Sequence, residues 1–593
     1  MSAPDLHVPT NPVRIVTAAS LFDGHDAAIN IMRRLLQSQG AEVIHLGHDR
    51  SVDEVVTAAI QEDAQGVAVS SYQGGHVEYF SYLVQLLGER GAEHIKVYGG
   101  GGGTIVPEEI AVLHERGVQR IFSPEDGQRL GLPGMINVII RECDVDLATT
   151  PPDRDALLTG DEHAIARTMT LLQAGIAPEW LPPAEDRTVP ILGITGTGGA
   201  GKSSLTDELV RRLRRDHEDK LRIAVLAIDP TRRRGGGALL GDRIRMNTIE
   251  PGRVLFRSLA TRASGAELPD NLAGIIGVCK ASGHDLVIVE TPGIGQGDAA
   301  IIDHADVNLY VMTPEFGAAS QLEKIDMLDF ADAVAINKFE RRGADDARRD
   351  VARQMVRNRG AFGTPWEEMP VFGTSAARFD DDGVTALYQE LKAQLVAVAG
   401  SGSALAQGGG AIPTVDVRCS SGLTTVVPGN RERYLADIVD TVRAYQRETD
   451  AQARIAGQLQ AVTTTARMLE AGEAADAVDE LADQLSGSLS DQTAALLAAW
   501  PRTVKDYSGD EIVFTVRDTE ITAPATRETL SGSKVRRVSL PRTTNHADLV
   551  TFLRSENLPG RFPFTAGVFP LKRDGEAPAR MFAGEGDPFR TNR

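Results

Sequence analysis

The stretch that most constrains the fold of this chain is the glycine-rich run Gly196–Ser203, which reads GTGGAGKS and fits the pattern G-x-x-x-x-G-K-[ST]. An apolar, strand-like segment precedes it at 189–194, and a segment with a helical pattern follows it at 204–210. Strand, glycine loop and helix in this order are typical of a loop that wraps around nucleotide phosphates. The sequence therefore predicts an α/β domain with a phosphate-binding loop.

The residue types of this loop suit phosphate chemistry. Small residues let backbone N–H groups close around phosphate oxygens, and the N-terminus of the following helix adds positive potential. Lys202 is expected to reach the terminal phosphates and to act in catalysis, while Ser203 offers a hydroxyl to magnesium. A glycine-rich turn without a ligand is the alternative. The motifs further along the chain favour nucleotide binding over that alternative.

Acidic residues follow further strands of the same domain. One strand-like run ends at Asp229 and another at Glu290, and Asp242 lies between them in the chain. Magnesium prefers an octahedron of hard oxygens, usually one or two carboxylates with waters and phosphates. We therefore expect Asp229, Asp242 and Glu290 to be magnesium ligands, and Asp242 to act in catalysis as well. The loops after Asp229 and Thr291 are expected to order on a γ-phosphate.

A further motif indicates which base is read. Asn337-Lys338-Phe339-Glu340 follows the strand-like run 333–336 and resembles the guanine-reading N-K-x-D, with Glu in place of Asp. A carboxylate at the fourth position accepts hydrogen bonds from N1–H and the exocyclic amine of guanine, which adenine does not offer. GTP is therefore the expected nucleotide, and Ser375–Ala376 is expected to complete the base pocket.

The part of the chain before this domain, residues 12–145, alternates between strand-like and helical runs five times. This alternation predicts a doubly wound, flavodoxin-like parallel sheet, whose ligands lie at the carboxyl ends of the strands. Three loops at that edge have unusual composition: 23–26, 70–76 and the five glycines 99–103. Because glycines are costly to order, five in a row indicate a close approach of the backbone to a bulky ligand.

These loops resemble the cobalamin-binding domain of the adenosylcobalamin mutases, whose fingerprint is D-x-H-x-x-G, then S-x-L, then G-G. Asp23 and His25 match the first two positions, Ser70 matches the serine, and Ala28 and Tyr72 stand where the family has glycine and leucine. A surface-loop histidine is the alternative for His25.

The resemblance implies a role for each matching residue. His25 is the lower ligand of cobalt in place of the cofactor's own base, and Asp23 hydrogen-bonds its other nitrogen. Ser70, Gly102 and Gly103 line the pocket for the displaced base.

The order of elements in the second domain resembles the G-protein chaperones of cobalamin mutases, which are in the same class as metallochaperone GTPases. The resemblance implies nucleotide contacts at Gly198, Gly199, Ala200, Gly201, Lys202, Ser203, Ser204, Arg245, Asn337, Lys338, Phe339 and Glu340. It implies magnesium ligands at Ser203, Asp229, Asp242, Glu290 and Thr291.

Charge and cysteine content narrow the classes of function. The chain carries 62 Lys and Arg against 82 Asp and Glu, a formal net charge of −20. This balance argues against binding of nucleic acid or anionic membranes, including by the arginines at 232–234. Cys143, Cys279 and Cys419 are far apart and have no metal-ligand spacing, which is typical of a reduced cytoplasm. The sequence has no run of about eighteen apolar residues and no signal-peptide pattern, so a cytoplasmic protein is expected.

The domain organisation follows from these segments and from two further ones. Residues 558–570 and 580–586 resemble the first segment of the substrate barrel of acyl-CoA mutases. A (β/α)₈ barrel needs at least about 200 residues, so we expect only its start and no complete mutase. The predicted parts are a cobalamin-binding domain at 12–145, a linker at 146–187, a P-loop GTPase at 188–400, a helical linker domain at 401–545 that begins with a flexible Gly/Ser/Ala-rich stretch, and the truncated substrate domain at 546–593.

In this arrangement the whole chain resembles the fused isobutyryl-CoA mutases. The resemblance implies adenosylcobalamin-dependent interconversion of isobutyryl-CoA and n-butyryl-CoA, with GTP hydrolysis gating cofactor loading or repair. It also implies a homodimer, and an adenosyltransferase as a possible source of cofactor. Phe569, aligned with a tyrosine of methylmalonyl-CoA mutases, favours an apolar acyl group. The alternatives are a fused mutase for another acyl-CoA, such as a methylmalonyl type, and a non-catalytic cobalamin carrier or sensor coupled to a GTPase.

Overall fold

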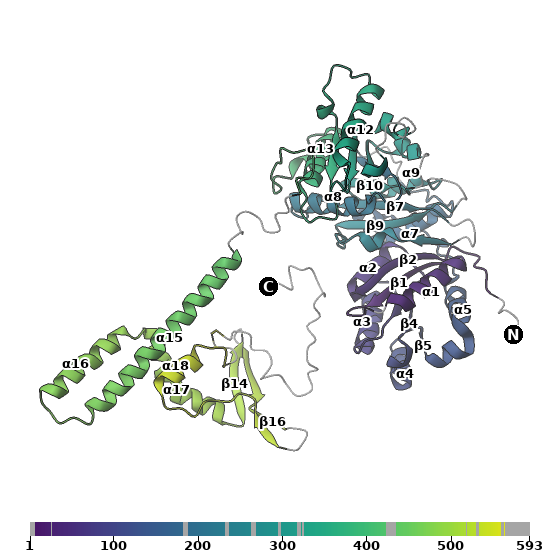
Figure 1. Ribbon diagram of the computed structural model, residues 1–593. Coiled ribbons are helices and arrows are strands. Elements are labelled where there is room, and N and C mark those ends of the chain that lie inside the picture. Colours follow the sequence, from purple (N-terminus) through teal and green to yellow (C-terminus); the bar gives the residue numbers. More distant parts are fainter. Residues whose placement is uncertain are drawn as a thin grey trace. The chain divides into compact units, whose positions relative to one another are not determined.

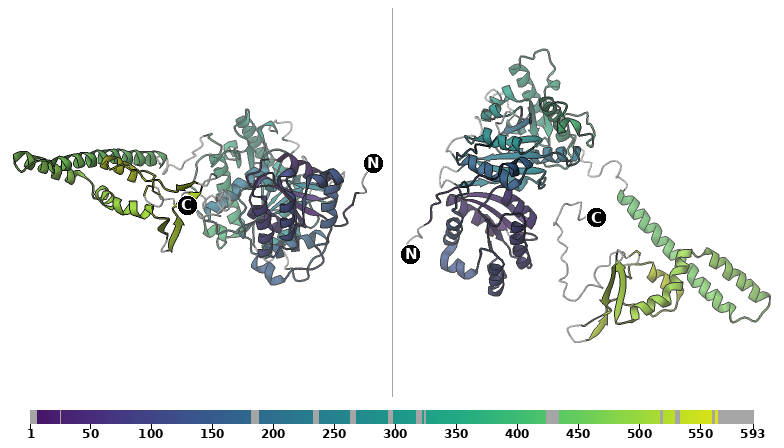
Figure 2. Two further views of the ribbon diagram at one scale, coloured as in Figure 1. Left: turned by 90° about the horizontal axis from the view of Figure 1, so that it is seen from below. Right: turned by 180° about the vertical axis from the view of Figure 1, so that it is seen from behind.

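The computed structural model describes residues 6–24, 26–181, 188–231, 237–262, 268–293, 298–316, 322, 325–422, 434–516, 519–528, 533–558 and 562–563. They form two compact units, with the division after residue 426. The first unit holds two parallel β-sheets, which lie next to each other in Figures 1 and 2.

The first sheet consists of β1 (Arg14–Ser20), β2 (Glu42–Arg50), β3 (Gly66–Ser70), β4 (Lys96–Gly100), β5 (Arg120–Phe122) and β8 (Ala238–Leu240). Its strands run parallel in the order β5-β4-β3-β1-β2-β8. Its helices are α1 (Asp26–Ser38), α2 (Val52–Gln61), α3 (His76–Glu89), α4 (Pro107–Glu115) and α5 (Pro124–Cys143). The sixth strand, β8, comes from the second domain of the sequence.

Helices cover both faces of this sheet, so every residue of β1 is buried. One face packs on α2, α3 and α4 around Phe80 and Leu83, and the other packs on α1 and α5 around Leu36 and Ile136. A capping box starts α2, in which Ser51 Oγ accepts from the backbone N–H of Glu54 at 3.3 Å. The predicted doubly wound, flavodoxin-like fold is confirmed.

The second sheet consists of β6 (Ile191–Gly196), β7 (Ile223–Asp229), β9 (Val254–Ala260), β10 (Leu286–Glu290), β11 (Val307–Met312), β12 (Ala333–Asn337) and β13 (Val371–Thr374). The order is β13-β12-β11-β6-β10-β7-β9, and all neighbours are parallel. Its helices are α8 (Lys202–Asp216), α9 (Leu272–Ala281), α11 (Met327–Phe330), α12 (Ala344–Asn358) and α13 (Asp382–Ala399). The predicted P-loop α/β fold is confirmed.

The segment expected to be a linker, 146–187, contributes two packed helices. They are α6 (Arg154–Thr159) and α7 (Glu162–Gln173). Ile165 and Met169 of α7 are fully buried, and α7 contacts both α2 of the first domain and α9 of the second. The helical patch expected here therefore forms part of the interface between the two domains.

The Gly/Ser/Ala-rich stretch at the start of the predicted helical linker domain was expected to be flexible, whereas the structure shows it packed on the GTPase domain. It forms the short helix α14 (Ala404–Gln407), with Leu405 buried. Asp216 accepts hydrogen bonds from the backbone N–H groups of Gly410 at 2.8 Å and Ile412 at 3.1 Å. Burial alone would raise the pKa of Asp216, but Lys392 and these hydrogen bonds lower it. Tertiary contacts, rather than the composition of this stretch, thus determine its conformation.

The second unit begins with the helices α15 (Tyr434–Ala466), α16 (Glu473–Ser488) and α17 (Asp491–Ser508). Two antiparallel pairs of strands follow: β14 (Glu511–Val516) with β15 (Thr519–Pro524), and β16 (Thr526–Glu528) with β17 (Lys534–Arg536). Only helices were expected in this part of the chain, whereas the structure has these strands as well. Along β14, Ile512 is buried and Val513 is exposed, which is the alternation typical of a strand with one covered face.

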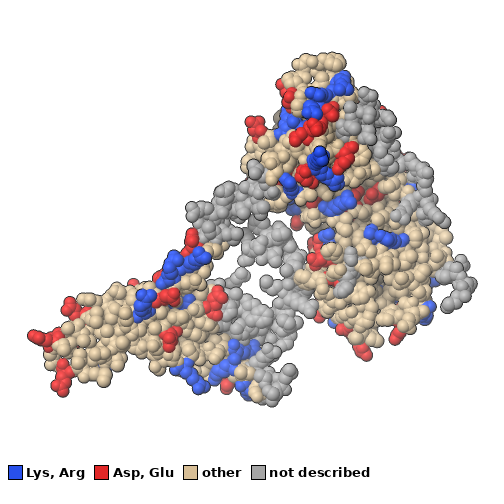
Figure 3. Space-filling model, viewed as in Figure 1, with Lys and Arg blue, Asp and Glu red and all other residues tan. Residues whose placement is uncertain are grey.

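Within the predicted barrel start at 546–593, the structure describes helix α18 (His546–Leu553), which packs on α15. Phe569 lies outside the described residues. Within the described parts of the chain, the helices are all too short or too polar to cross a bilayer. On the face drawn in Figure 3, the described Lys and Arg are interspersed with Asp and Glu and form no extended basic patch.

Candidate functional sites

The glycine-rich loop between β6 and α8 has the backbone geometry that its composition predicts. Gly196, Gly199 and Gly201 have φ angles of 142°, 74° and 89°, which favour glycine. A side chain at Gly196 would collide with the backbone of Val311 on the neighbouring strand. The buried Nζ of Lys202 donates to the carbonyl of Gly196 at 3.1 Å, so the lysine folds back over the loop.

Two of the predicted magnesium-binding carboxylates meet at the start of α8. The Oγ of Ser203 lies 2.9 Å from Oδ1 of Asp242 and 2.7 Å from Oε1 of Glu290. The other oxygen of Glu290 accepts from Thr206 Oγ1 at 2.8 Å. Asp242 and Glu290 come from different elements, so the fold brings together residues that are far apart in the sequence.

The electrostatics of these acids indicate a cation site. Burial, together with the charges of Asp242 and Glu290, raises the pKa of Asp229 well above its ordinary value. Burial and the charge of Asp242 raise the pKa of Glu290 to about 7. Asp229 Oδ2 is buried and has no hydrogen-bond partner among the described residues. A divalent cation would relieve this crowding of carboxylates.

The described residues contain no cluster of three or more His, Cys, Asp or Glu that would hold a metal ion unaided. A magnesium ion bound beside phosphates needs only one or two carboxylates, so the donor set fits that case. The other two predicted residues differ in position. Thr291 Oγ1 donates to Thr195 Oγ1 at 2.7 Å, whereas the exposed Arg245 lies near Asp229 and lowers its pKa.

The predicted base-reading residues contact the glycine-rich loop directly. Asn337 Nδ2 donates to the carbonyl of Ala200 at 2.8 Å, and Lys338 Nζ donates to that of Gly199 at 2.7 Å. Asn337 Oδ1 accepts from the backbone N–H of Ala376 at 3.1 Å.

The other two residues of the motif are also held in place. Glu340 Oε2 accepts from Ser375 Oγ at 2.8 Å, and the Phe339 ring lies against Gly373, where any side chain would collide with it. The fold thus joins the base motif, the glycine-rich loop and Ser375–Ala376 in one site.

A cavity of about 230 Å³ opens at the carboxyl edge of the first sheet. Its lining is mainly apolar and includes Ala28, Ser70, Tyr72, Gly102, Phe122 and Ile136. Two of the predicted pocket residues, Ser70 and Gly102, are therefore in the lining, and so are both residues that depart from the family pattern. Ser70 Oγ is buried and has no hydrogen-bond partner among the described residues, as expected of a group that awaits a ligand.

The remaining predicted residues of this edge are Asp23, His25 and Gly103. Asp23 is fully buried, and its Oδ2 accepts from the backbone N–H of Tyr72 at 2.7 Å, which ties the first loop to the second. His25 lies outside the described residues, and Gly103 is exposed and not part of the cavity lining. Gly99 and Gly101 are needed by the protein's own packing, because a side chain would collide with Phe80 or with the carbonyl of Ser71.

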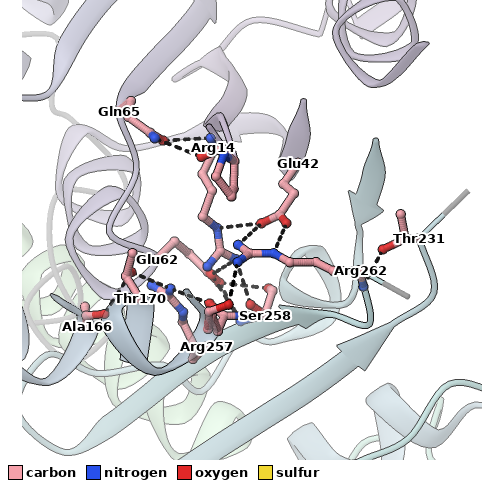
Figure 4. Close-up of polar contacts among 12 residues, drawn as sticks. Arg14, Glu42, Glu62, Gln65, Ala166, Thr170, Thr231, Arg257, Ser258 and Arg262 are labelled. Atoms are coloured by element: carbon pink, nitrogen blue, oxygen red, sulfur yellow. Dashed lines mark hydrogen bonds and ion pairs between the residues drawn. The ribbon is translucent and has the colours of Figure 1, made fainter. Parts of the chain in front are cut away.

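A polar interface between the two domains, which was not predicted from the sequence, is shown in Figure 4. Arg14 of β1 donates to Glu62 Oε2 at 3.0 Å and to the carbonyl of Ser258 on β9 at 2.6 Å. Arg262 pairs with Glu42 of β2 at 2.7 Å. The available signal was the charge of Arg14 and Glu42 at the first positions of two strands, where apolar residues follow directly.

Two protein-family models match the chain at these two sheets. The B12 binding domain matches residues 13–127, and the Methylmalonyl Co-A mutase-associated GTPase MeaB matches residues 181–408. Taken with the folds and sites described above, the chain joins a B12-binding domain to a MeaB-type GTPase domain. This confirms the cobalamin and GTPase classes predicted from the sequence.

The comparison with individual proteins is more specific. The fused isobutyryl-CoA mutase of Nocardia farcinica is 63% identical over 598 residues, covering 100% of this chain and 55% of that protein. Those of Cupriavidus metallidurans and Geobacillus kaustophilus are 58% and 50% identical, covering 99% of this chain in each case. The chain spans about half the length of these relatives. Over its whole length it is similar to the fused isobutyryl-CoA mutases, which confirms the resemblance predicted from the sequence.

Proposed function

We propose that this chain is the cofactor-binding and GTP-hydrolysing part of an adenosylcobalamin-dependent mutase that interconverts isobutyryl-CoA and n-butyryl-CoA. GTP hydrolysis would gate loading or repair of the cofactor. The observation that carries the proposal is the pairing of an open cavity at one sheet edge with a complete phosphate and base site in the same compact unit. The acyl-CoA substrate is proposed from the names of the relatives, because this chain spans only about half of their length.

The cavity fits the displaced base of cobalamin by its apolar lining and by the unpartnered hydroxyl of Ser70. Ser70 and Gly102 would contact that base, and Asp23 would orient the first loop through its bond to Tyr72. His25 as the axial cobalt ligand and Gly103 as a pocket residue stay predictions. Bound adenosylcobalamin would supply the radical that starts the rearrangement, and the protein would supply binding and orientation.

In the GTPase domain, Lys202 would exchange its bond to Gly196 for one to the terminal phosphates and stabilise their charge. Ser203, Asp242 and Glu290 would hold Mg²⁺, with Asp229 close by. Glu340, held by Ser375, would accept from guanine and so select GTP. Thr291 as a magnesium ligand and Arg245 as a nucleotide contact stay predictions.

Three further expectations stay predictions. They are a homodimer, a supply of cofactor by an adenosyltransferase, and a cytoplasmic location. The location is supported by the cysteines, which are free thiols at Cys143, Cys279 and Cys419.

The axial ligand gives the sharpest test of the cobalamin assignment. The purified chain is loaded with cob(II)alamin and its electron paramagnetic resonance spectrum is recorded. We expect nitrogen hyperfine structure from an imidazole, its loss in His25→Ala, and its retention in His48→Ala. His48 is an exposed histidine on β2 and serves as the matched control. A spectrum that His25→Ala leaves unchanged would overturn the ligand assignment, and a chain that binds no corrin would overturn the proposed function.

A further inference from the structure

Residues 238–248 belong to the GTPase domain by sequence, but their first part is built into the other domain. β8 pairs with β2 in parallel, with Val43 opposite Leu239. Ala238 and Leu240 are fully buried in the core of the first sheet, and Leu239 packs against the opposite face. The strand is therefore covered on both faces and fixed to the B12-binding domain.

The residues just after β8 reach the magnesium site. The backbone N–H of Gly241 acts on the Asp229 carboxylate and lowers its pKa. Asp242 begins a short 3₁₀ helix, η3 (Asp242–Arg245), and its Oδ1 lies 2.9 Å from Ser203 Oγ. The position of Asp242 thus depends on a segment whose preceding strand is held by the neighbouring domain.

The next residue, Arg243, is bound to that neighbouring domain. Its buried guanidinium donates to Gln61 Oε1 at 2.8 Å and lies 3.6 Å from Glu62 Oε1, and it also donates to the carbonyl of Phe256 at 2.9 Å. Gln61 and Glu62 lie at the C-terminal end of α2 and are fully buried. Asp242 and Arg243 are adjacent in the chain. A shift of the groups that hold the Arg243 side chain would therefore also move Asp242.

Two more contacts make the segment rigid. Ile244 packs on Gly47 of β2, where an added Cβ would lie 2.8 Å from Ile244 Cδ1. On the other side, Asp207 of α8 accepts from the backbone N–H of Asn247 at 2.9 Å and from Thr248 Oγ1 at 2.7 Å. The segment is therefore tied to both domains at several points, with Asp242 between the ties.

From these contacts we infer that the B12-binding domain sets the position of a magnesium ligand of the GTPase. Gln61 and Glu62 act through Arg243 as positioning residues for Asp242. The inference rests on the proposed function, in which Asp242 holds Mg²⁺ beside GTP. By linkage, Mg²⁺ and nucleotide bound at Asp242 would in turn strengthen the hold of the segment on the B12-binding domain.

The strand that receives β8 also reaches the cobalamin loop. Near the other end of β2, Asp49 Oδ1 accepts from the backbone N–H of Phe22 at 2.7 Å, next to the buried Asp23. One strand therefore contacts both the segment that holds Asp242 and the loop that leads to His25. The proposed magnesium site and the proposed cobalamin site are therefore both connected to β2.

The test compares two buried glutamines, Gln61 at the C-terminal end of α2 and Gln65 just before β3. Gln61→Ala removes one hydrogen-bond acceptor of Arg243, together with the bonds of the Gln61 side chain to Phe256, Val254 and Glu162. Gln65→Ala removes hydrogen bonds to Arg14, Pro12 and Val145, all within the B12-binding domain. Binding of Mn²⁺, as a probe for Mg²⁺, is measured by electron paramagnetic resonance on the chain with a non-hydrolysable GTP analogue. Loss of a residue that orients a metal ligand typically weakens metal binding by about 10- to 100-fold.

We expect a loss of that size for Gln61→Ala, a matching rise in the Mg²⁺ concentration needed for GTP hydrolysis, and unchanged nucleotide affinity in EDTA. Gln65→Ala should stay within about twofold of the parent chain by the same scale. Arg243→Lys, which keeps the charge but shortens the reach, replaces Gln61→Ala if that variant does not fold. Equal Mn²⁺ affinity in all variants would overturn the inference alone. A parent chain that neither binds Mn²⁺ with nucleotide nor hydrolyses GTP would overturn the proposed function and the inference together.

Discussion

The two sheets of the first unit present their sites in opposite ways. At the nucleotide site, polar groups satisfy one another: Lys202 bonds Gly196, Asn337 bonds Ala200 and Lys338 bonds Gly199. At the edge of the first sheet an apolar cavity stays open, and Ser70 Oγ has no partner among the described residues. Binding of a phosphate must replace internal bonds, whereas binding of an apolar base fills existing space. The first site therefore depends on charge, and the second depends on shape.

The largest effect is expected at Lys202. Lys202→Ala removes the lysine predicted to reach the terminal phosphates, and loss of one stabilising donor typically costs about 10²- to 10³-fold in kcat. GTP turnover measures this loss, and cobalamin binding should not change. Lys220→Ala, an exposed lysine of the same domain, is the control. Undiminished hydrolysis in Lys202→Ala would contradict a charge-dependent phosphate site.

Glu340 should give the next largest effect. Glu340→Ala removes the carboxylate that pairs with guanine, and hydrogen bonds to charged groups contribute about 1.5–3 kcal/mol each. We expect GTP affinity to fall by about 10- to 100-fold, and affinity for ITP, which lacks the exocyclic amine, to fall less. Glu340→Asp should retain most of the preference. Equal losses for GTP and ITP would mean that Glu340 does not read the base.

The pH dependence of stability tests the crowding of carboxylates. The pKa of Glu290 is raised from 4.5 to about 7, so the folded protein binds more protons than the unfolded chain in this range. The free energy of unfolding of the metal-free protein should therefore fall as pH rises from 4.5 to about 7 through this group. Thermal unfolding in EDTA should show a weaker slope for Glu290→Gln than for the parent chain. Parallel curves would argue against the raised pKa.

The smallest effect is expected at Ser70, where the site depends on shape. Ser70→Ala removes one neutral hydrogen bond, worth about 1 kcal/mol, so cobalamin binding should weaken about fivefold. Ser70→Leu fills the cavity and should weaken binding far more. Fluorescence quenching by added cobalamin measures both. A larger loss for alanine than for leucine would reverse the proposed contrast between the two sheets.

Much of both sites was predictable because short motifs of consecutive residues indicate them. The loop Gly196–Ser203 needs positive φ angles that only its glycines adopt easily, and Asn337–Glu340 follows a buried strand directly. The first sheet was predictable from its strict β/α alternation. In each case the signal lies in residues that are neighbours in the sequence.

The remaining features depend on contacts between distant residues. β8 has only three residues and no periodicity of its own, and it is a strand because β2 offers an unpaired edge. Arg243 is buried by Gln61, which lies 182 residues away in the chain. The Gly/Ser-rich run after α13 is ordered by Asp216. Amino-acid composition cannot indicate contacts with residues that are distant in the sequence.

The three residues of β8 have one further consequence, for the solubility of the B12-binding domain on its own. Cut away from its neighbour, that domain would expose the first three residues of β2, Glu42 to Ile44, as a bare edge of backbone N–H and C=O groups. Such edges recruit strands from other molecules and promote aggregation. A recombinant B12-binding domain should therefore stay monomeric only when residues 237–241 are grafted back as a cover.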